Sequence, residues 1–320
     1  MLLRMSSPIP ALRLRDWLML TALSMLWGGS FFFNRVAVEE LIPPVVVASR
    51  QTIGGLILFG VLRARGLRLP RGRRVWAQFL LMGLLNNAIP FSLIVWSQAR
   101  IASGLASILN AATPLFTMLV AHLFTRDDRM TGPRILGLLA GFVGVVVVIG
   151  PAALGSSNSG GSDPVLPQLA ILAAGVSYAV AGVFGRRFAR QGLRPETIAT
   201  GQVLCSAALL VPPALVGYLL VPAVSTGATV MVMPSVAVLV ALFCLGALST
   251  AAAYILYFSL LERVGATNLL MVTFLIPLTA ILLGVVVLGE PLVFRQILGM
   301  LIVFAGILVA QIWNSLFGRR

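Results

Sequence analysis

The sequence has no lysine, one histidine, two cysteines and nine acidic residues in 320 positions. Charged residues make up 10% of the chain and apolar residues 59%, which excludes an ordinary soluble surface and indicates an integral membrane protein. Cys205 and Cys244 stand far apart inside apolar runs, with no histidine or second cysteine at ligand spacing. We therefore expect neither a disulfide nor a metal site, and no cofactor.

The acidic residues all fall at the ends of apolar runs or between them. A proton-driven antiporter for organic cations usually has an intramembrane carboxylate, because a buried acid exchanges its proton for the cation directly. Without one, coupling must use another group or be absent, as in facilitated export down a gradient. A membrane-embedded enzyme would need a group of acids, bases, nucleophiles or metal ligands near a cavity, and the sequence has none, so no catalytic residue is predicted. A channel is also disfavoured, because no ring of charged residues is visible.

The basic residues are all arginines, mostly in short clusters between apolar runs. A net charge of +14 would suit a nucleic-acid-binding protein if these residues shared a soluble face. Their clustering is instead typical of membrane topology signals, and no nucleic-acid partner is expected. If the amino terminus is cytoplasmic, only Arg35, Arg50, Arg100 and Arg295 fall toward the outside, so the positive-inside rule predicts both termini in the cytoplasm.

About 20 apolar residues are needed to cross the hydrocarbon core of a membrane. Arginine clusters, prolines and glycines divide this chain into ten stretches of suitable length, which predicts an all-α membrane protein with ten transmembrane helices. The expected spans cover residues 17–35, 44–62, 75–99, 102–124, 133–151, 165–185, 196–220, 234–259, 265–288 and 292–316.

The sequence contains an internal repeat. Residues 83–114 match residues 246–277 at a constant separation of 163, and the front of each half matches at a separation of 151, with Trp27 opposite Tyr178. Such self-similarity indicates a fold built from two copies of one unit.

Each copy holds five expected spans, an odd number, so the second copy must enter the membrane from the opposite side. We expect two inverted five-helix repeats around a central cavity, with a first repeat in 1–151, a Gly- and Ser-rich periplasmic linker in 152–163 and a second repeat in 164–320. In this architecture two halves rock about a site near the membrane midplane, which favours solute transport.

Motifs in both halves resemble the EamA family of the drug/metabolite transporter (DMT) superfamily, and the resemblance covers nearly the whole chain. It is strongest to amino-acid and metabolite exporters, including the YddG-type aromatic amino-acid exporters. The resemblance implies a ten-helix basket with a central cavity, with the fifth and tenth spans at its periphery, in the bacterial inner membrane. In the first copy Arg126-Asp127-Asp128 departs from the family pattern. The motifs are Trp27-Gly28-Gly29, Pro114, Pro277, Gly284, Leu288-Gly289-Glu290, Gln296 and Gly299.

Polar and aromatic residues at mid-depth of the spans are the candidate substrate-binding residues. They predict a cavity with amide and hydroxyl groups, aromatic walls and no fixed charge, which suits a zwitterion with an apolar side chain. The alternative is that half or more of them face other helices or lipid. The candidates are Trp27, Asn86, Asn87, Ser92, Trp96, Asn110, Tyr178, Ser249, Tyr254 and Tyr257.

Three prolines inside the spans, Pro90, Pro114 and Pro277, are predicted helix breaks, because proline interrupts the backbone hydrogen-bond ladder. His122 is a candidate gating residue or proton handle, and the competing interpretation is a hydrogen-bonded histidine at a helix end. Glu290 is read as the start of the last span.

Gly137 and Gly141 form a pair of small residues four apart. This spacing predicts a close contact with another helix, in the same chain or in a second protomer.

Together these features predict a secondary transporter of the bacterial inner (plasma) membrane that exports amino acids, including aromatic and other neutral ones, or related metabolites by alternating access. A facilitator and a proton-coupled exporter of other metabolites or drugs both stay open, and a membrane-embedded enzyme is less favoured. The expected partners are a small-molecule substrate and the lipid bilayer, and the protein is a monomer or a homodimer.

Overall fold

The computed structural model describes residues 12–125, 130–150, 165–220, 233–269 and 271–317. Within these ranges the chain is helical and contains no strand, as the sequence predicts. The expected linker 152–163 and the segment Arg126-Asp127-Asp128 lie outside them. In chain order the elements are α1 (Leu14–Ala37), α2 (Pro43–Ala64), α3 (Arg73–Gly83), η1 (Leu84–Ala88), α4 (Ile89–Gln98), α5 (Ser103–Asn110), α6 (Thr113–Phe124), α7 (Gly132–Ile149), α8 (Val165–Arg190), α9 (Pro195–Leu220), α10 (Val236–Gly246), η3 (Ala247–Ala252), α11 (Ala253–Leu269), α12 (Val272–Leu288) and α13 (Phe294–Phe317).

Seven helical segments of the described chain are long and apolar enough to cross a membrane, and α12 and α13 contribute shorter apolar stretches. The outer surface of the bundle carries large exposed apolar side chains, for example Leu136, Leu139, Val143 and Val146 on α7. Such an outer face suits contact with lipid, where helices also satisfy their own backbone polar groups.

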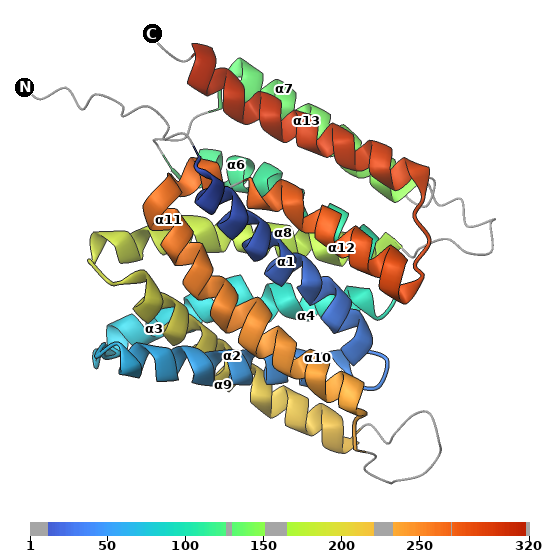
Figure 1. Cartoon of the computed structure of the whole chain (residues 1–320). Helices are drawn as coiled ribbons and strands as arrows, with labels where there is room; N and C mark the ends of the chain where they lie inside the picture. Colours follow the sequence, from blue (N-terminus) through green and yellow to red (C-terminus); the bar gives the residue numbers. More distant parts are fainter. Residues whose placement is uncertain (1–11, 126–129, 151–164, 221–232, 270, 318–320) are drawn as a thin grey trace, which may run out of the picture.

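Successive segments run back and forth across the bundle (Figure 1). α1 begins and α13 ends at the same side, at the upper left of the view. The helix termini follow local chemistry. α2 begins with two prolines, Pro43 and Pro44, whose missing N–H groups a first turn does not need, and α12 ends at Gly289, which adopts a left-handed conformation with φ of 65°.

Two π-helices interrupt long helices near their middles. η1 lies between α3 and α4, and η3 lies between α10 and α11. Their first residues, Leu84 and Ala247, are 163 positions apart, which is the separation of the sequence repeat. π-helical turns are rare and occur frequently at functional sites, so the repeat carries an irregular feature as well as helices.

The predicted proline breaks differ in outcome. Pro90 begins α4 directly after η1, and Pro114 lies in the first turn of α6 after a turn at Ala111 and Ala112. The predicted break at Pro277 is wrong, because Pro277 lies inside α12, which continues to Leu288. An interior proline is tolerated in membrane helices when neighbouring groups satisfy the freed carbonyl. The preceding element α11, by contrast, contains a non-helical residue at Gly265, where φ is 75°.

The two halves interlock through pairs of helices. α1 packs on α12 and α6 packs on α8, while α2 packs on α9 and α7 packs on α13. Each of these pairs joins one helix from the first copy to one from the second. The pair α7 and α13 lies along one side of the molecule (Figure 1).

Glycines let α7 and α13 approach backbone to backbone. A Cβ on Gly144 would lie 2.8 Å from the carbonyl oxygen of Gly299, and a Cβ on Gly137 would overlap the carbonyl oxygen of Gly306. A Cβ on Gly306 would in turn lie 2.8 Å from the Cα of Gly141. The small-residue spacing in α7 therefore marks a contact within this chain.

We predict that Gly144→Ala destabilises the protein by about 1–3 kcal/mol, because the added methyl group forces α7 away from α13. Gly60→Ala is the matched control, since a Cβ there meets nothing within 4 Å and alanine favours the helix. Thermal unfolding of both purified variants in detergent measures the difference. Equal midpoints for the two variants would contradict the close packing.

Candidate functional site

The hydroxyl of Tyr254, near the start of α11, collects three amide side chains. Nδ2 of Asn86 and Nδ2 of Asn87 lie 3.3 Å from the Tyr254 oxygen, and Nε2 of Gln202 lies 3.1 Å from it. The Tyr254 oxygen is therefore the shared acceptor of the N–H groups of all three amides. The arrangement joins η1, α9 and α11 at the middle of the bundle.

Several polar atoms beside this junction are buried and have no hydrogen-bond partner among the described residues. They are Oδ1 of Asn87, Oε1 of Gln202, Oγ of Ser249 and both polar side-chain atoms of Gln51. Buried polar atoms are normally paired, and an unpaired one is costly where water is scarce. These atoms therefore offer hydrogen-bonding capacity to a polar solute.

At each π-helix a side chain from another helix donates a hydrogen bond to a backbone carbonyl. Pro90 has no N–H, so the carbonyl of Leu85 lacks the donor that a π-helical turn would supply, and the hydroxyl of Ser177 donates to it at 2.7 Å. In η3 the carbonyl of Ser249 accepts from Nη2 of Arg50 at 3.3 Å. Polar side chains thus hold both breaks in place.

The sequence predicts a cavity without fixed charge, but Arg50 is a buried cation in α2 beside the candidate residue Ser249, with only 3% of the residue exposed. Nε donates to Oγ1 of Thr250 at 3.0 Å, and the guanidinium lies 4.0 Å from the centre of the Phe91 ring. The expectation of a neutral cluster is therefore wrong at Arg50. One feature of the sequence indicates this burial: Arg50 lies inside an apolar run, where a charged side chain raises the free energy of the folded protein.

We call Arg50, Asn86, Asn87, Gln202, Ser249, Thr250 and Tyr254 the central polar cluster. Arg50 joins α2 to this cluster through its hydrogen bonds to Thr250 and Ser249 in η3, and η3 continues directly into α11, which carries Tyr254.

Aromatic candidates pair across helices near this cluster. The rings of Trp27 and Tyr257 have centroids 5.5 Å apart, and those of Phe91 and Tyr178 are 6.4 Å apart. Tyr254 stacks on Phe258 at 6.0 Å. Among these rings, Phe91 lies against Arg50 and Phe258 lies against Tyr254, so apolar faces border the cluster at these two residues.

Other candidates lie further along their helices. Ser92 and Trp96 are partly buried in α4, and the exposed Arg100 stacks on Trp96 at 4.2 Å. Asn110 ends α5, and its Oδ1 has no partner among the described residues. His122 is exposed near the end of α6, where its Nδ1 accepts a hydrogen bond from the backbone N–H of Met130 at 3.2 Å.

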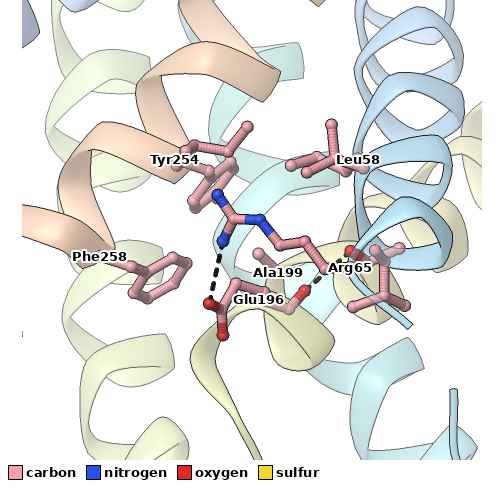
Figure 2. Close-up of a pocket in the computed structure, with 10 residues that line it drawn as sticks. Leu58, Arg65, Glu196, Ala199, Tyr254 and Phe258 are labelled. Atoms are coloured by element: carbon pink, nitrogen blue, oxygen red, sulfur yellow. Dashed lines mark hydrogen bonds and ion pairs between the residues drawn. The ribbon is translucent and has the colours of Figure 1, made fainter. Parts of the chain in front are cut away.

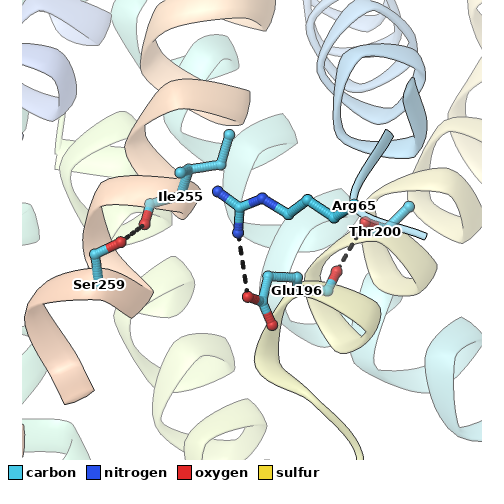
Figure 3. A network of polar contacts seen from close by, with 5 residues as sticks. All are labelled: Arg65, Glu196, Thr200, Ile255 and Ser259. Carbon is cyan, nitrogen blue, oxygen red and sulfur yellow. Dashed lines mark hydrogen bonds and ion pairs between the residues drawn. The ribbon is translucent and has the colours of Figure 1, made fainter. Parts of the chain in front are cut away.

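A pocket opens between α2, α9 and α11 and reaches the ring of Tyr254 (Figure 2). Arg65 and Glu196 form an ion pair across it, with 3.3 Å between Nη1 and Oε1. The hydroxyl of Thr200 donates to the carbonyl of Glu196 at 2.8 Å in the same network (Figure 3). Tyr254 thus lines this pocket and also belongs to the central polar cluster.

At the opposite end of the bundle, carboxylates from loops bind helix N-termini. Glu290 accepts from the backbone N–H of Ser103 at 2.9 Å, from the Ser103 hydroxyl at 3.0 Å and from the N–H of Gly104 at 3.3 Å. The sequence predicts Glu290 only at the start of the last span, whereas in the structure it also caps the N-terminus of α5. The Ser235 hydroxyl and backbone N–H donate to Glu40 and hold the pKa of that carboxyl below its usual value.

We predict that Tyr254→Phe destabilises the protein by about 1–3 kcal/mol, because the three amides lose their shared partner while staying buried. Tyr218→Phe removes the same hydroxyl from an exposed tyrosine of α9 and serves as the control. Thermal unfolding in detergent compares the two variants. A Tyr254→Phe midpoint as high as that of the control would show that the hydroxyl does not organise the cluster.

A helical membrane bundle with two matching halves and buried polar groups at its middle has the features of a membrane transport protein. The chain belongs to the EamA-like transporter family, which matches residues 16–150 and again residues 166–311.

Similar proteins span nearly the whole chain. It is 28% identical over 294 residues to the uncharacterized inner membrane transporter YedA of Escherichia coli strain K12, covering 91% of this chain and 89% of that protein. It is 24% identical over 309 residues to a probable amino-acid metabolite efflux pump of the same strain, covering 96% of each. A solved crystal structure with 23% identity superimposes with a TM-score of 0.62 over 92% of this chain and 98% of the other, which supports the fold.

Proposed function

We propose that this transporter exports amino acids, or related small metabolites, from the bacterial cytoplasm by alternating access. The observation that carries the proposal is the central polar cluster, where two π-helical breaks from matching halves meet unpaired amide and hydroxyl groups at mid-depth. Transporters commonly bind solutes near the midplane, at interrupted helices between two repeats. The rings around the cluster suit an apolar side chain.

We further propose ten spans in two inverted repeats, with both termini in the cytoplasm and a periplasmic linker in 152–163. Three observations support this topology. α1 begins and α13 ends on the same side of the bundle, the π-helices keep the spacing of the repeat, and most arginines fall on that same side. The proposed location is the inner membrane, and the relative YedA is named as an inner membrane transporter.

Ion pairs and hydrogen bonds at the two ends of the bundle support alternating access, because each of them joins one half to the other. At the proposed cytoplasmic end Arg65 pairs with Glu196, and Arg263 pairs with Asp16 at 3.0 Å. At the proposed periplasmic end Glu40 binds the N–H of Ser235, and Glu290 caps α5. Opening either end requires its own ties to break while the other end stays closed.

The amino-acid class is favoured by the chemistry of the cluster. Amide, hydroxyl and guanidinium groups can bind an ammonium and a carboxylate together, whereas a purely apolar drug would leave them unpaired. One relative is named a probable amino-acid metabolite efflux pump. The name supports the same class for this protein.

We predict that the purified protein in proteoliposomes moves labelled neutral amino acids, with aromatic and large aliphatic ones fastest. The test uses a panel of amino acids, with and without an imposed pH gradient, and protein-free vesicles as the control. Transport without a gradient indicates a facilitator. Strict dependence on the proton gradient would contradict the facilitator and leave proton-coupled export. Failure of every amino acid in the panel would overturn the proposed substrate class.

We also predict that Glu196→Gln opens the cytoplasmic end. An exposed ion pair contributes about 0.2–1 kcal/mol, which corresponds to a population shift of at most about fivefold. A cysteine at Ala199, which lines the pocket, should then react up to about fivefold faster with a polar maleimide when Cys205 and Cys244 are replaced by alanine. Glu262→Gln changes an exposed acid of α11 and is the control. Equal labelling rates in the two variants would rule out the ion pair as a gate.

A further inference from the structure

We infer that Arg50 is the anion-binding residue of the transport site and that the solutes it selects carry a carboxylate. This inference rests on the proposed function and names the chemistry of its substrate. The guanidinium of Arg50 is buried at mid-depth and positioned by neutral groups, so a carboxylate of the solute supplies the opposite charge.

The first argument is the cost of the charge. A buried cation is strongly destabilising unless it is paired, and arginine stays protonated in proteins. Among the described residues no carboxylate pairs with Arg50. The described acids that have a partner, such as Asp16, Glu40, Glu196 and Glu290, bind it near the ends of the bundle. A cation kept at this cost is expected to have a function in binding.

The second argument is the geometry of the guanidinium. Nε binds the Thr250 hydroxyl and Nη2 binds the carbonyl of Ser249, which accounts for two of its five N–H donors. The Phe91 ring covers one face. The remaining donors have the planar, paired arrangement that binds a carboxylate through both oxygens.

The third argument is that the donors are already held in place. The Thr250 hydroxyl in turn donates to the carbonyl of Leu245 at 2.9 Å, and a Cβ on Gly54 would lie 2.9 Å from the Thr250 Cβ, so α2 and η3 are in direct contact. A guanidinium fixed before binding loses little conformational entropy when the solute arrives.

The fourth argument is that packing alone does not call for arginine here. The equivalent position in the second copy, 151 residues later, is Gly201, and α2 and α9 nevertheless pack on each other. If Arg50 only tied η3 to α2, an amide side chain could make the same hydrogen bonds without a buried charge. The unpaired oxygens of Asn87 and Gln202 in the same cluster are suitable acceptors for an ammonium group.

The test uses four labelled solutes that share one ring and differ in their charged groups: phenylalanine, 3-phenylpropionate, phenylalaninamide and phenethylamine. We expect wild-type proteoliposomes to transport the first two at least about tenfold faster than the last two, after subtraction of leakage into protein-free vesicles. Equal rates for solutes with and without a carboxylate would overturn the role of Arg50 and leave the proposed transport function intact. Transport of none of the four would overturn the inference, and the proposed function fails only if every amino acid of the panel described above fails as well.

Variants then assign the preference to Arg50. The ratio of phenylalanine to phenylalaninamide transport is independent of the amount of folded protein. It should fall about tenfold or more in Arg50→Gln and stay intermediate in Arg50→Lys, which keeps the charge without the paired donors. The control is Arg100→Gln, because the exposed Arg100 also stacks on a ring and binds a carbonyl, at Trp96.

We expect the wild-type ratio in the Arg100→Gln control. An unchanged ratio in Arg50→Gln would refute the assignment, and if that variant does not fold, an unchanged ratio in Arg50→Lys refutes the need for paired donors.

Discussion

A backbone carbonyl freed inside a membrane protein must find a donor from another part of the chain, and the centre of this protein follows from that constraint. The π-helical turns η1 and η3 lie at mid-length of two long helices, and in η1 Pro90 leaves the carbonyl of Leu85 without a backbone donor. Ser177 of α8 reaches Leu85, and Arg50 of α2 reaches Ser249. The interruptions that break the helices therefore also bring polar side chains to the middle of the bundle.

The two copies share a backbone plan and differ in chemistry. The first copy supplies the cation Arg50 where the second has Gly201, and the second copy supplies the phenol of Tyr254 where the first has Phe91, 163 residues earlier. The two copies therefore contribute different polar groups to the central polar cluster, a guanidinium from the first copy and a phenol from the second.

The bonds between the halves differ in strength from place to place. The pair α7 and α13 is held backbone to backbone by glycines, including Gly144 and Gly299, and forms a rigid contact. At the ends of the bundle the ties are single ion pairs or caps, such as Arg65 with Glu196, and each is weak. The two halves are therefore joined most weakly at the ends of the bundle.

The sequence by itself determined the membrane class, the all-helical fold class and the family, because apolar length, repeated spacing and motifs are all local or periodic signals. It also marked Asn86, Asn87 and Tyr254 as candidates. Only the tertiary structure decided that these three share one hydroxyl, that Glu290 caps α5, that Pro277 leaves its helix unbroken and that Arg50 is buried. The physical reason is that burial and hydrogen-bond partners depend on residues far apart in the chain.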